Sequence, residues 1–349
     1  MKKILLIRLS AIGDVVMASG LLNAIKAKYP QAHITWLVEP AAAGLLKENT
    51  LVDQVVLWPK SDWQAMWREK RWGELWRTIR AFRQRLHSEQ FDLSLDTQGI
   101  FKSAFLGWLS GAKRRVGVGK KEGSHLFHTE TIPRVDEKPN MCSEYIDLAE
   151  YLGLNRKDYR MSVAFSSATE QQVKQLMQEE GLKGPYAVFC PFTTRPQKHW
   201  FDHHWLELTQ TLRQRGYQLV MLGGPGDLEH ANAIAAQGDV INLVGKTSLL
   251  GAAAVIDGSA LLVGVDTGLT HIGIAREVPT VAIFGSTRPY LEPLNDAGRV
   301  IYEKLSCSPC RRHPTCGGEF TCMLNIDADK VIHVIDSIVP SDRTVRPSS

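Results

Sequence analysis

The sequence predicts an α/β protein built from two doubly wound parallel-sheet domains, and three observations support that class. Short apolar strands alternate with amphipathic helices from residue 3 to about residue 117, and a second such series starts at residue 186. The chain has 349 residues, which exceeds one ordinary core and suits two domains of about 150 residues each. Hydrophobic residues make up 44% and charged residues 22%, which are globular values.

In the first half, apolar runs predict strands at 3–9, 34–38, 54–57 and 91–95, and helical periodicity predicts helices at 15–28 and 41–47. Residues 111–128 carry many cations among glycines and are interpreted as a loop. Such a loop suits an acceptor that bears carboxylates or phosphates, and a solvated loop is the alternative. The candidate acceptor contacts in and near this loop are Lys102, Arg115, Lys120 and Lys121.

The second half repeats the pattern after a junction at about residue 165, which predicts domains of residues 1–165 and 166–349. A helix is expected at 171–180, followed by strands at 186–190, 218–222, 242–243, 260–265 and 281–284. A C-terminal helix at about 327–338 is expected to pack back across the first domain.

The turn Asp266-Thr267-Gly268 connects a buried strand to a helix rich in small residues. A helix N-terminus offers unpaired N–H groups and a positive dipole end, which together suit a phosphate, and Gly268 lets that phosphate approach the backbone. Thr267 adds a hydroxyl donor, and His271 adds an imidazole one helical turn further on. The alternative is a plain helix cap with a packed histidine.

Three more strand ends carry candidate site residues. Thr193, Thr194 and Lys198 follow the strand at 186–190 and can form a pyrophosphate clamp. Asp227 follows the strand at 218–222 and can hold a ribose hydroxyl. Asp14 follows the first strand and points into the crevice at its carboxyl end, unless it only caps the next helix.

Several classes of function are excluded by what the sequence lacks. No Gly-x-Gly-x-x-Gly follows the first strand, which argues against a dinucleotide enzyme. The formal net charge of +4 is too mild for a dedicated nucleic-acid binder. The apolar run at the N-terminus is too short for a signal peptide, and no stretch approaches the roughly 20 apolar residues of a membrane-spanning helix. We therefore expect a cytoplasmic protein.

The interval 60–89 combines tryptophans with arginines. Trp63 and Trp67, then Trp72 and Trp76, are spaced by four, and the interval holds eight basic against four acidic residues. A basic, tryptophan-bearing helix can rest on an anionic membrane surface, which would make the protein peripherally associated with the membrane. Core packing of the tryptophans beside a solvated basic face is the alternative.

Four of the six cysteines lie close together near the C-terminus, at Cys307, Cys310, Cys316 and Cys322. Such a group can close a zinc site. The two outer spacings differ from the short paired knuckles of typical zinc sites, and a compact loop of reduced thiols is the alternative.

Four motifs in this order resemble those of bacterial lipopolysaccharide heptosyltransferases, members of glycosyltransferase family 9. They are Ser-x-x-Gly-Asp at 10–14, Asp-x-Gln-Gly-x-x-Lys-Ser at 96–103, Thr-Thr-Arg-x-x-Lys-His-Trp at 193–200 and Asp-Thr-Gly-Leu-Thr-His at 266–271. The third motif resembles that of the first heptosyltransferase of the pathway more than that of the second. The cysteine-rich stretch departs from this pattern and is more typical of other branches of the family.

The resemblance implies a GT-B fold, in which two Rossmann-like domains face a central cleft. It also implies an ADP-heptose donor and a Kdo (3-deoxy-manno-octulosonic acid) acceptor on lipid A, reached from the cytoplasmic face of the inner membrane. By matching position, Asp14 corresponds to the general base, with Ser10 and Gly13 beside it. The expected donor contacts are Thr193, Thr194, Lys198, Asp227, Asp266, Thr267, Gly268 and His271.

The expected chemistry is transfer with inversion, in which a carboxylate accepts the proton of the attacking hydroxyl. No Asp-x-Asp pair stands beside the expected nucleotide, so fixed donors are expected to stabilise the leaving diphosphate. We therefore expect a reaction that needs neither a metal ion nor a cofactor.

Overall fold

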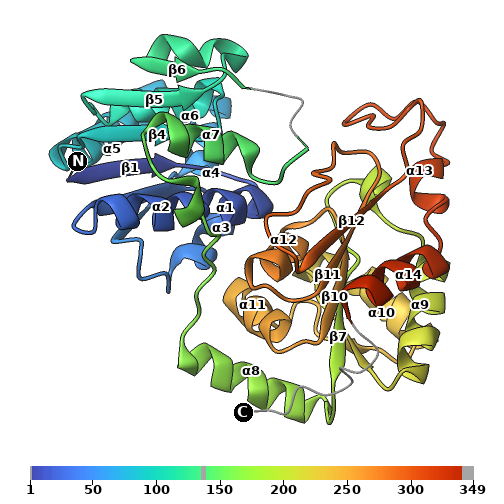
Figure 1. The fold of residues 1–349 in the computed structure, drawn as a ribbon. Coiled ribbons are helices and arrows are strands. Elements are labelled where there is room, and N and C mark those ends of the chain that lie inside the picture. Colours follow the sequence, from blue (N-terminus) through green and yellow to red (C-terminus); the bar gives the residue numbers. More distant parts are fainter. Residues whose placement is uncertain (1, 135–138, 340–349) are drawn as a thin grey trace. The chain divides into compact units, whose positions relative to one another are not determined.

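The computed structural model describes residues 2–134 and 139–339, and its contacts divide the chain into two compact units (Figure 1). The first unit comprises residues 1–138 and 142–164, and the second comprises residues 139–141 and 165–349. We call them the first and second domains. Among the described residues, no helix is both long enough and apolar enough to span a bilayer.

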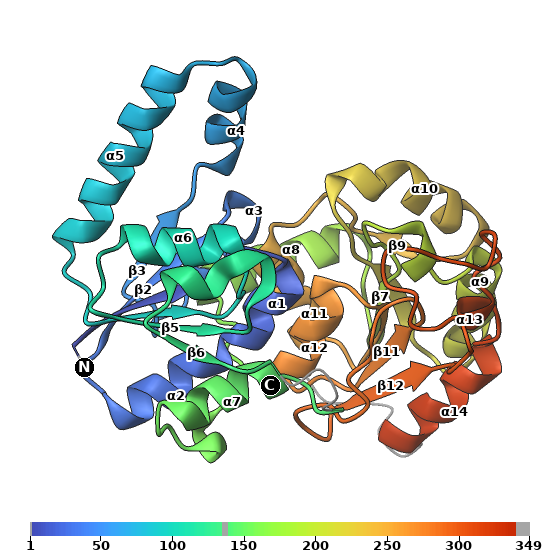
Figure 2. The same ribbon diagram turned by 90° about the horizontal axis from the view of Figure 1, so that it is seen from above.

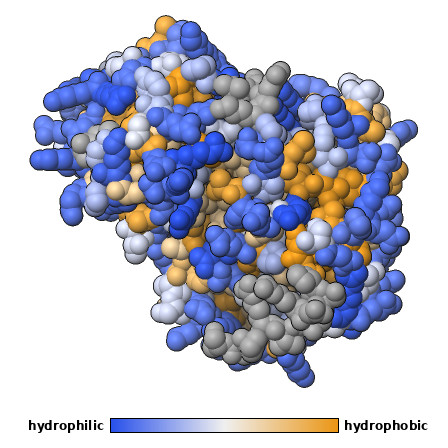
Figure 3. All heavy atoms as spheres, viewed as in Figure 1, coloured by the Kyte–Doolittle hydropathy of each residue, from blue (hydrophilic) through white to orange (hydrophobic). Residues whose placement is uncertain are grey.

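The first domain contains a six-stranded parallel sheet in the order β3-β2-β1-β4-β5-β6. Its strands are β1 (Lys3–Ile7), β2 (His33–Val38), β3 (Gln54–Leu57), β4 (Leu93–Asp96), β5 (Arg114–Val118) and β6 (Glu130–Ile132). The central strands are buried on both faces, as their continuous apolar runs predict. At the outer edge of this domain, the side chains on the face shown in Figure 3 are mainly hydrophilic.

Helices connect these strands: α1 (Ile12–Ala18), α2 (Gly20–Lys28), α3 (Pro40–Ala43), α4 (Lys60–Arg68), α5 (Trp72–Ser88), α6 (Phe101–Leu109) and α7 (Ser143–Tyr151). The helix expected at 15–28 is interrupted at Ser19, whose hydroxyl donates to the carbonyl of Val16. The ring of Tyr159 lies where a Cβ on Gly20 would fall, so only glycine fits at the start of α2. Because Tyr159 is distant in the sequence, the hydrophobic periodicity of residues 15–28 gives no sign of this contact.

The second domain repeats the architecture, with strand order β12-β11-β10-β7-β8-β9. Its strands are β7 (Tyr186–Cys190), β8 (Gln218–Met221), β9 (Ile241–Asn242), β10 (Leu261–Val265), β11 (Thr280–Phe284) and β12 (Gly298–Tyr302). Its helices are α8 (Ser167–Glu179), α9 (Asp202–Gln214), α10 (Leu228–Gln237), α11 (Leu249–Asp257), α12 (Gly268–Ala275), α13 (Thr321–Leu324) and α14 (Ala328–Ile338). The prediction of two doubly wound parallel sheets is therefore confirmed.

In each sheet, the strand order reverses between the first and fourth strands of that domain. These pairs are β1 and β4 in the first domain, and β7 and β10 in the second. In doubly wound sheets, ligands bind outside the carboxyl ends of the strands at this switch point. The loops after these four strands are therefore the places to examine for a site.

The structure corrects two expectations about elements. The predicted loop at 111–128 contains strand β5, in which Arg114 bonds Glu130 through Nε and Nη2 at 2.7 and 2.8 Å. The C-terminal helix was expected to pack across the first domain, but α14 packs on α9, β11 and β12 of the second. Val331 and Ile335, on the apolar face of α14, are buried in the core of the second domain.

Candidate active site

In the second domain, an ion pair joins the two loops at the switch point. Lys198 lies in a short 3₁₀ turn after β7, and Asp266 directly follows β10. The Nζ of Lys198 lies 2.6 Å from Oδ2 of Asp266 and donates to the main-chain oxygen of the same residue at 3.1 Å. The structure thus brings together two residues that lie 68 positions apart in the chain.

Asp266 has two further partners. The hydroxyl of Thr287 donates to Oδ2 at 2.6 Å, and Nε2 of His271 lies 3.4 Å from Oδ1. Burial alone would raise the pKa of Asp266, but the bond from His271 and the charge of Lys198 outweigh it and hold the pKa well below its usual range. Asp266 is therefore a fixed anion that orients Lys198.

His271 is buried and has protein partners at both ring nitrogens. Its Nδ1 lies 2.8 Å from the hydroxyl of Tyr290, and its Nε2 faces Asp266. A neutral ring that accepts from Tyr290 carries its proton on Nε2 and donates to Asp266. The imidazole therefore supports Asp266, and its contact with a bound anion stays a prediction.

The N-terminus of α12 has the form expected of an anion site. Thr267 is its N-cap residue with an extended backbone, and its hydroxyl makes no capping hydrogen bond. The first N–H groups of the helix, at Gly268 and Leu269, point out of its first turn. Thr267 and Gly268 are partly exposed, so both the hydroxyl and these N–H groups are accessible to a phosphate.

The remaining donor candidates lie on neighbouring loops of the same sheet edge. Thr193 is partly exposed and Thr194 is exposed; the Thr193 carbonyl accepts from Nε2 of His199 at 2.9 Å. Asp227 follows β8, and its Oδ2 accepts the N–H of Gly224 at 2.8 Å. The Asp227 carboxylate therefore closes a local turn with one of its two oxygens.

In the first domain, Asp14 lies in the first turn of α1 and pairs with Arg8, which follows β1. Its Oδ2 contacts Arg8 and accepts the N–H of Ala11 at 3.2 Å. Within the part of the chain that the structure describes, Oδ1 of Asp14 has no hydrogen-bond partner. The side chain is 33% exposed, so this oxygen can accept a proton from a ligand.

Arg8 is the buried centre of this cluster. Its Nη1 donates to the carbonyl of Thr97 at 2.9 Å, which ties the loop after β1 to the loop after β4. Oε1 of Glu144 lies 3.9 Å from the same nitrogen, and the ring of Tyr145 lies beside the guanidinium. Burial lowers the pKa of Arg8, but Asp14, Tyr145 and Glu144 together raise it above its ordinary value. Arg8 therefore stays charged and orients Asp14.

The acceptor candidates have different surroundings. Ser10 is partly exposed, and Gly13 is buried in the first turn of α1. Lys120 and Lys121 are exposed, and neither has an ion-pair partner among residues 2–134 and 139–339. The Nζ of Lys102 on α6 lies 5.8 Å from the centre of the Trp58 ring.

The acceptor candidate Arg115 is held by main-chain carbonyls. It lies in β5, and its guanidinium donates to the carbonyls of Phe127 and Ala112, both at 2.8 Å. These bonds tie Arg115 to the residues before and after β5, and a contact between Arg115 and the acceptor stays a prediction. Nearby, the buried ring of His128 lies 3.0 Å from the carboxylate of Asp96 at the end of β4.

The cysteine-rich stretch holds four neighbouring free thiols. Cys322 is buried, and Cys307, Cys310 and Cys316 are partly buried. Burial and the neighbouring thiols raise the pKa of Cys322. No group of three or more His, Cys, Asp or Glu side chains within the described ranges has the arrangement needed to hold a metal ion.

Sequence reasoning missed the residues that support the site. Arg8 lies within the strand predicted at 3–9 and was not identified as a site residue, although a buried arginine requires a carboxylate partner and Asp14 is six positions away. Thr287 and Tyr290 lie in a loop after β11, and nothing in their local sequence indicates contact with Asp266 or His271. Only the parallel order of β10 and β11 places them there.

Comparisons with known proteins identify relatives of this chain. A family model described as glycosyltransferase family 9 (heptosyltransferase) matches residues 79–319. Lipopolysaccharide heptosyltransferase 1 of Pseudomonas aeruginosa is 27% identical over 333 residues, covering 90% of this chain and 87% of that protein. Lipopolysaccharide heptosyltransferase 2 of Salmonella typhimurium is also 27% identical, over 354 residues that cover 97% of this chain and 99% of that protein.

A solved structure extends the comparison to the fold. The Escherichia coli heptosyltransferase WaaC with ADP-2-deoxy-2-fluoro heptose aligns with a TM-score of 0.72 at 25% identity, covering 96% of this chain and 99% of the other. Together with the two six-stranded sheets, this likeness confirms the predicted GT-B fold class.

Proposed function

The chain belongs to glycosyltransferase family 9 and is a glycosyltransferase, and we propose that it transfers L-glycero-D-manno-heptose from ADP-heptose to Kdo of lipid A. This is a type I heptosyltransferase reaction of the lipopolysaccharide inner core. The observation that carries the proposal is the pair of Lys198 and Asp266, which joins the two switch-point loops next to the open N-terminus of α12. That arrangement provides a cation and N–H donors for the diphosphate of a nucleotide sugar.

The donor half of the reaction depends on the second domain. As the bond to the sugar breaks, negative charge grows on the leaving diphosphate, and Lys198 with the N–H groups of Gly268 and Leu269 stabilises it. Preorganised donors of this kind are each worth about 3 kcal/mol of barrier. Asp266 contributes by holding Lys198 in place before the substrate arrives. The relative with a bound ADP-heptose analogue supports this assignment of the donor.

The acceptor half depends on Asp14. The free Oδ1 of its carboxylate accepts the proton of the Kdo hydroxyl while that oxygen attacks the anomeric carbon, and ADP departs from the opposite face. The reaction inverts the anomeric configuration. Arg8 orients the carboxylate of Asp14 through Oδ2. Because Arg8 contacts Oδ2, Oδ1 of Asp14 remains available to accept the proton.

The acceptor type needs a direct test, because relatives of types 1 and 2 are equally similar to this chain. The protein is incubated with ADP-heptose and either Kdo-lipid A or a core acceptor that already carries one heptose, each with and without a chelator. We expect the mass of Kdo-lipid A to increase by one heptosyl residue at an unchanged rate when the chelator is present. Extension of only the heptose-bearing acceptor would assign a type II or III enzyme, and binding of ADP-heptose without any product would indicate a nucleotide-sugar-binding protein.

The acceptor is anchored by lipid A, so the proposal also locates the reaction. We place the enzyme in the cytoplasm, peripherally associated with the inner membrane. Separation of cell extracts into soluble and membrane fractions tests this, and release of the membrane-bound fraction by salt is expected for a peripheral protein.

A further inference from the structure

Helices α4 and α5 form a hairpin that extends beyond the sheet of the first domain (Figure 2). The base of the hairpin is anchored, because Phe82 and Leu86 of α5 belong to the core of that domain. Trp63 of α4 packs edge to face on Phe82, with ring centres 5.5 Å apart. Residues 69–71 connect the two helices at the far end.

Three tryptophans of this hairpin are not in the core. Trp67, Trp72 and Trp76 are 63%, 48% and 68% exposed, whereas Trp63 is 8% exposed. Trp67 and Trp72 pack edge to face across the connection, with ring centres 4.4 Å apart. A soluble surface gains nothing from three exposed indoles, but an indole suits a lipid interface because it has an apolar body and a polar N–H.

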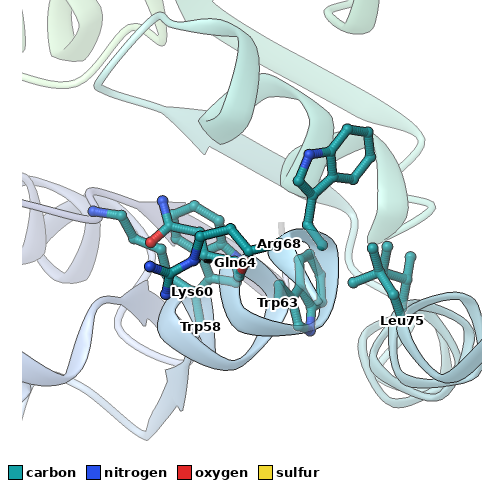
Figure 4. Close-up of a pocket in the computed structure, with 8 residues that line it drawn as sticks. Trp58, Lys60, Trp63, Gln64, Arg68 and Leu75 are labelled. Carbon is teal, nitrogen blue, oxygen red and sulfur yellow. Dashed lines mark hydrogen bonds between the residues drawn. The ribbon is translucent and has the colours of Figure 1, made fainter. Parts of the chain in front are cut away.

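An apolar pocket adjoins these tryptophans. It has a volume of about 620 Å³ and lies between the two helices, with cationic side chains among its lining residues (Figure 4). It is lined by Trp58, Lys60, Trp63, Gln64, Trp67, Arg68, Leu75 and Ile79. The hairpin therefore presents apolar surface in this pocket as well as at its exposed tryptophans.

The charge of the chain is concentrated on the same hairpin. Residues 60–89 hold eight of the 41 basic and four of the 37 acidic side chains, which leaves 33 of each sign in the remainder. The whole formal charge of +4 thus belongs to this segment. Arg77, Arg80 and Arg85 are exposed, and none has a carboxylate partner among the described residues.

Two of the exposed tryptophans and two of the arginines share one side of α5. Trp72, Trp76, Arg80 and Arg83 are spaced by four, four and three residues, which places them on a single stripe of the helix. Leu75 and Phe82 lie on the flank beside this stripe and face the core. Aromatic rings at one end and cations along the rest match the boundary between acyl chains and headgroup phosphates.

From these observations, we propose that the α4–α5 hairpin docks on the surface of an anionic lipid bilayer. Trp67, Trp72 and Trp76 lie at the level of the headgroups, and the arginines contact lipid phosphates. Charge complementarity favours this occupant, because a second copy of the same basic hairpin would repel the first. The proposal deepens the peripheral membrane association proposed above but does not depend on the identity of donor or acceptor.

The experiment measures co-sedimentation of the full chain, without substrates, with vesicles of phosphatidylethanolamine and phosphatidylglycerol or of phosphatidylcholine alone. We expect binding to the anionic vesicles that weakens as salt is added. The double variant Arg80→Gln with Arg83→Gln should bind about 25-fold more weakly, since each cation near such a surface contributes about fivefold. The triple variant Trp67→Ala, Trp72→Ala and Trp76→Ala should bind at least about tenfold more weakly.

Matched controls are available on other surfaces. Arg156→Gln with Lys157→Gln removes two exposed cations of the first domain, and Leu228→Ala removes an exposed apolar side chain of the second. Both should bind vesicles like the wild type. The triple tryptophan variant should keep wild-type turnover with a soluble, deacylated acceptor, which separates loss of docking from unfolding.

Three results would overturn the proposal. These are wild-type protein that remains in the supernatant with anionic vesicles, a triple variant that binds them as tightly as the wild type, or a wild-type dimer that the tryptophan substitutions dissociate. The variants can lose vesicle binding as expected while the wild type transfers no heptose. In that case the docking proposal stands and only the proposed function fails.

Discussion

Replacing Lys198 by methionine tests the donor site most directly. Methionine keeps most of the length of the side chain but removes the charge, so the ion pair with Asp266 at 2.6 Å and the bond to its main-chain oxygen at 3.1 Å are both lost. Asp266 retains the hydroxyl of Thr287 and the imidazole of His271. The substitution therefore removes the cation while two of the bonds that hold the carboxylate remain.

The structure sets the expected magnitudes. Breaking a fully buried pair costs about 3–5 kcal/mol of stability. Here both side chains are about 15% exposed and Asp266 keeps two partners, so we expect about 2 kcal/mol. Loss of one preorganised donor to the leaving diphosphate should lower kcat by about 10²–10³-fold, and affinity for ADP should fall as well.

The stability difference should depend on pH in a defined direction. The pKa of Asp266 is lowered in the folded protein, so its contribution is present above the ordinary carboxyl pKa of about 3.9 and disappears as the pH falls through the lowered value. The difference in free energy of unfolding between wild type and Lys198→Met should therefore be constant near neutral pH. It should shrink below about pH 4.

The measurements are urea unfolding at several pH values, calorimetric binding of ADP, and initial rates with saturating acceptor. Lys174→Met is the matched control, because Lys174 forms an exposed pair with Glu170 on α8 at 2.7 Å and should cost less than about 0.5 kcal/mol. The reasoning is refuted if Lys198→Met changes neither ADP affinity nor kcat by more than about twofold, while the affinity for the acceptor falls.

Three further predictions follow from the two loop networks. Asp14→Asn should lower kcat by at least about 10²-fold and leave ADP affinity within about twofold, and rates above a tenth of wild type would contradict its role as base. Tyr290→Phe removes the hydroxyl that lies 2.8 Å from Nδ1 of His271. Urea unfolding should show a free energy of unfolding lower by about 1 kcal/mol. Initial rates should show a smaller loss of kcat than Lys198→Met causes. Lys120→Gln with Lys121→Gln should raise the KM of a phosphorylated acceptor and leave that of the donor unchanged; equal changes in both would argue against an acceptor role.

Local pattern was sufficient to predict the elements near the donor site. The strand at Tyr186–Cys190 was predicted with its observed bounds, and the turn at Asp266 lies between a strand and a helix as expected. Buried parallel strands are short apolar runs, and Gly or Asp at their ends marks the turns, so both features are visible in the sequence. The loop that contains Lys198 was located for the same reason.

Where the sequence interpretation failed, contacts between elements decided the outcome. Strand β5 is polar at its start because Arg114 pairs with Glu130 across the edge of the sheet, and the cations there indicated a loop instead. The sequence also gave no sign that the guanidinium of Arg115 is bonded to two main-chain carbonyls. The hydrophobic periodicity of α14 predicts an amphipathic helix, but it does not specify which domain the apolar face of that helix packs against.

The sequence by itself determined the class of fold, the central strands of both sheets, and which loops carry Asp14, Lys198 and Asp266. These properties follow from residue type and spacing, which act over a few positions. Only the tertiary structure decided that Asp266 is held by Lys198, Thr287 and His271, and that Arg8 holds Asp14 through one oxygen. Lys198 and Thr287 follow other strands than Asp266 does, and parallel pairing brings those strand ends to one edge of a sheet.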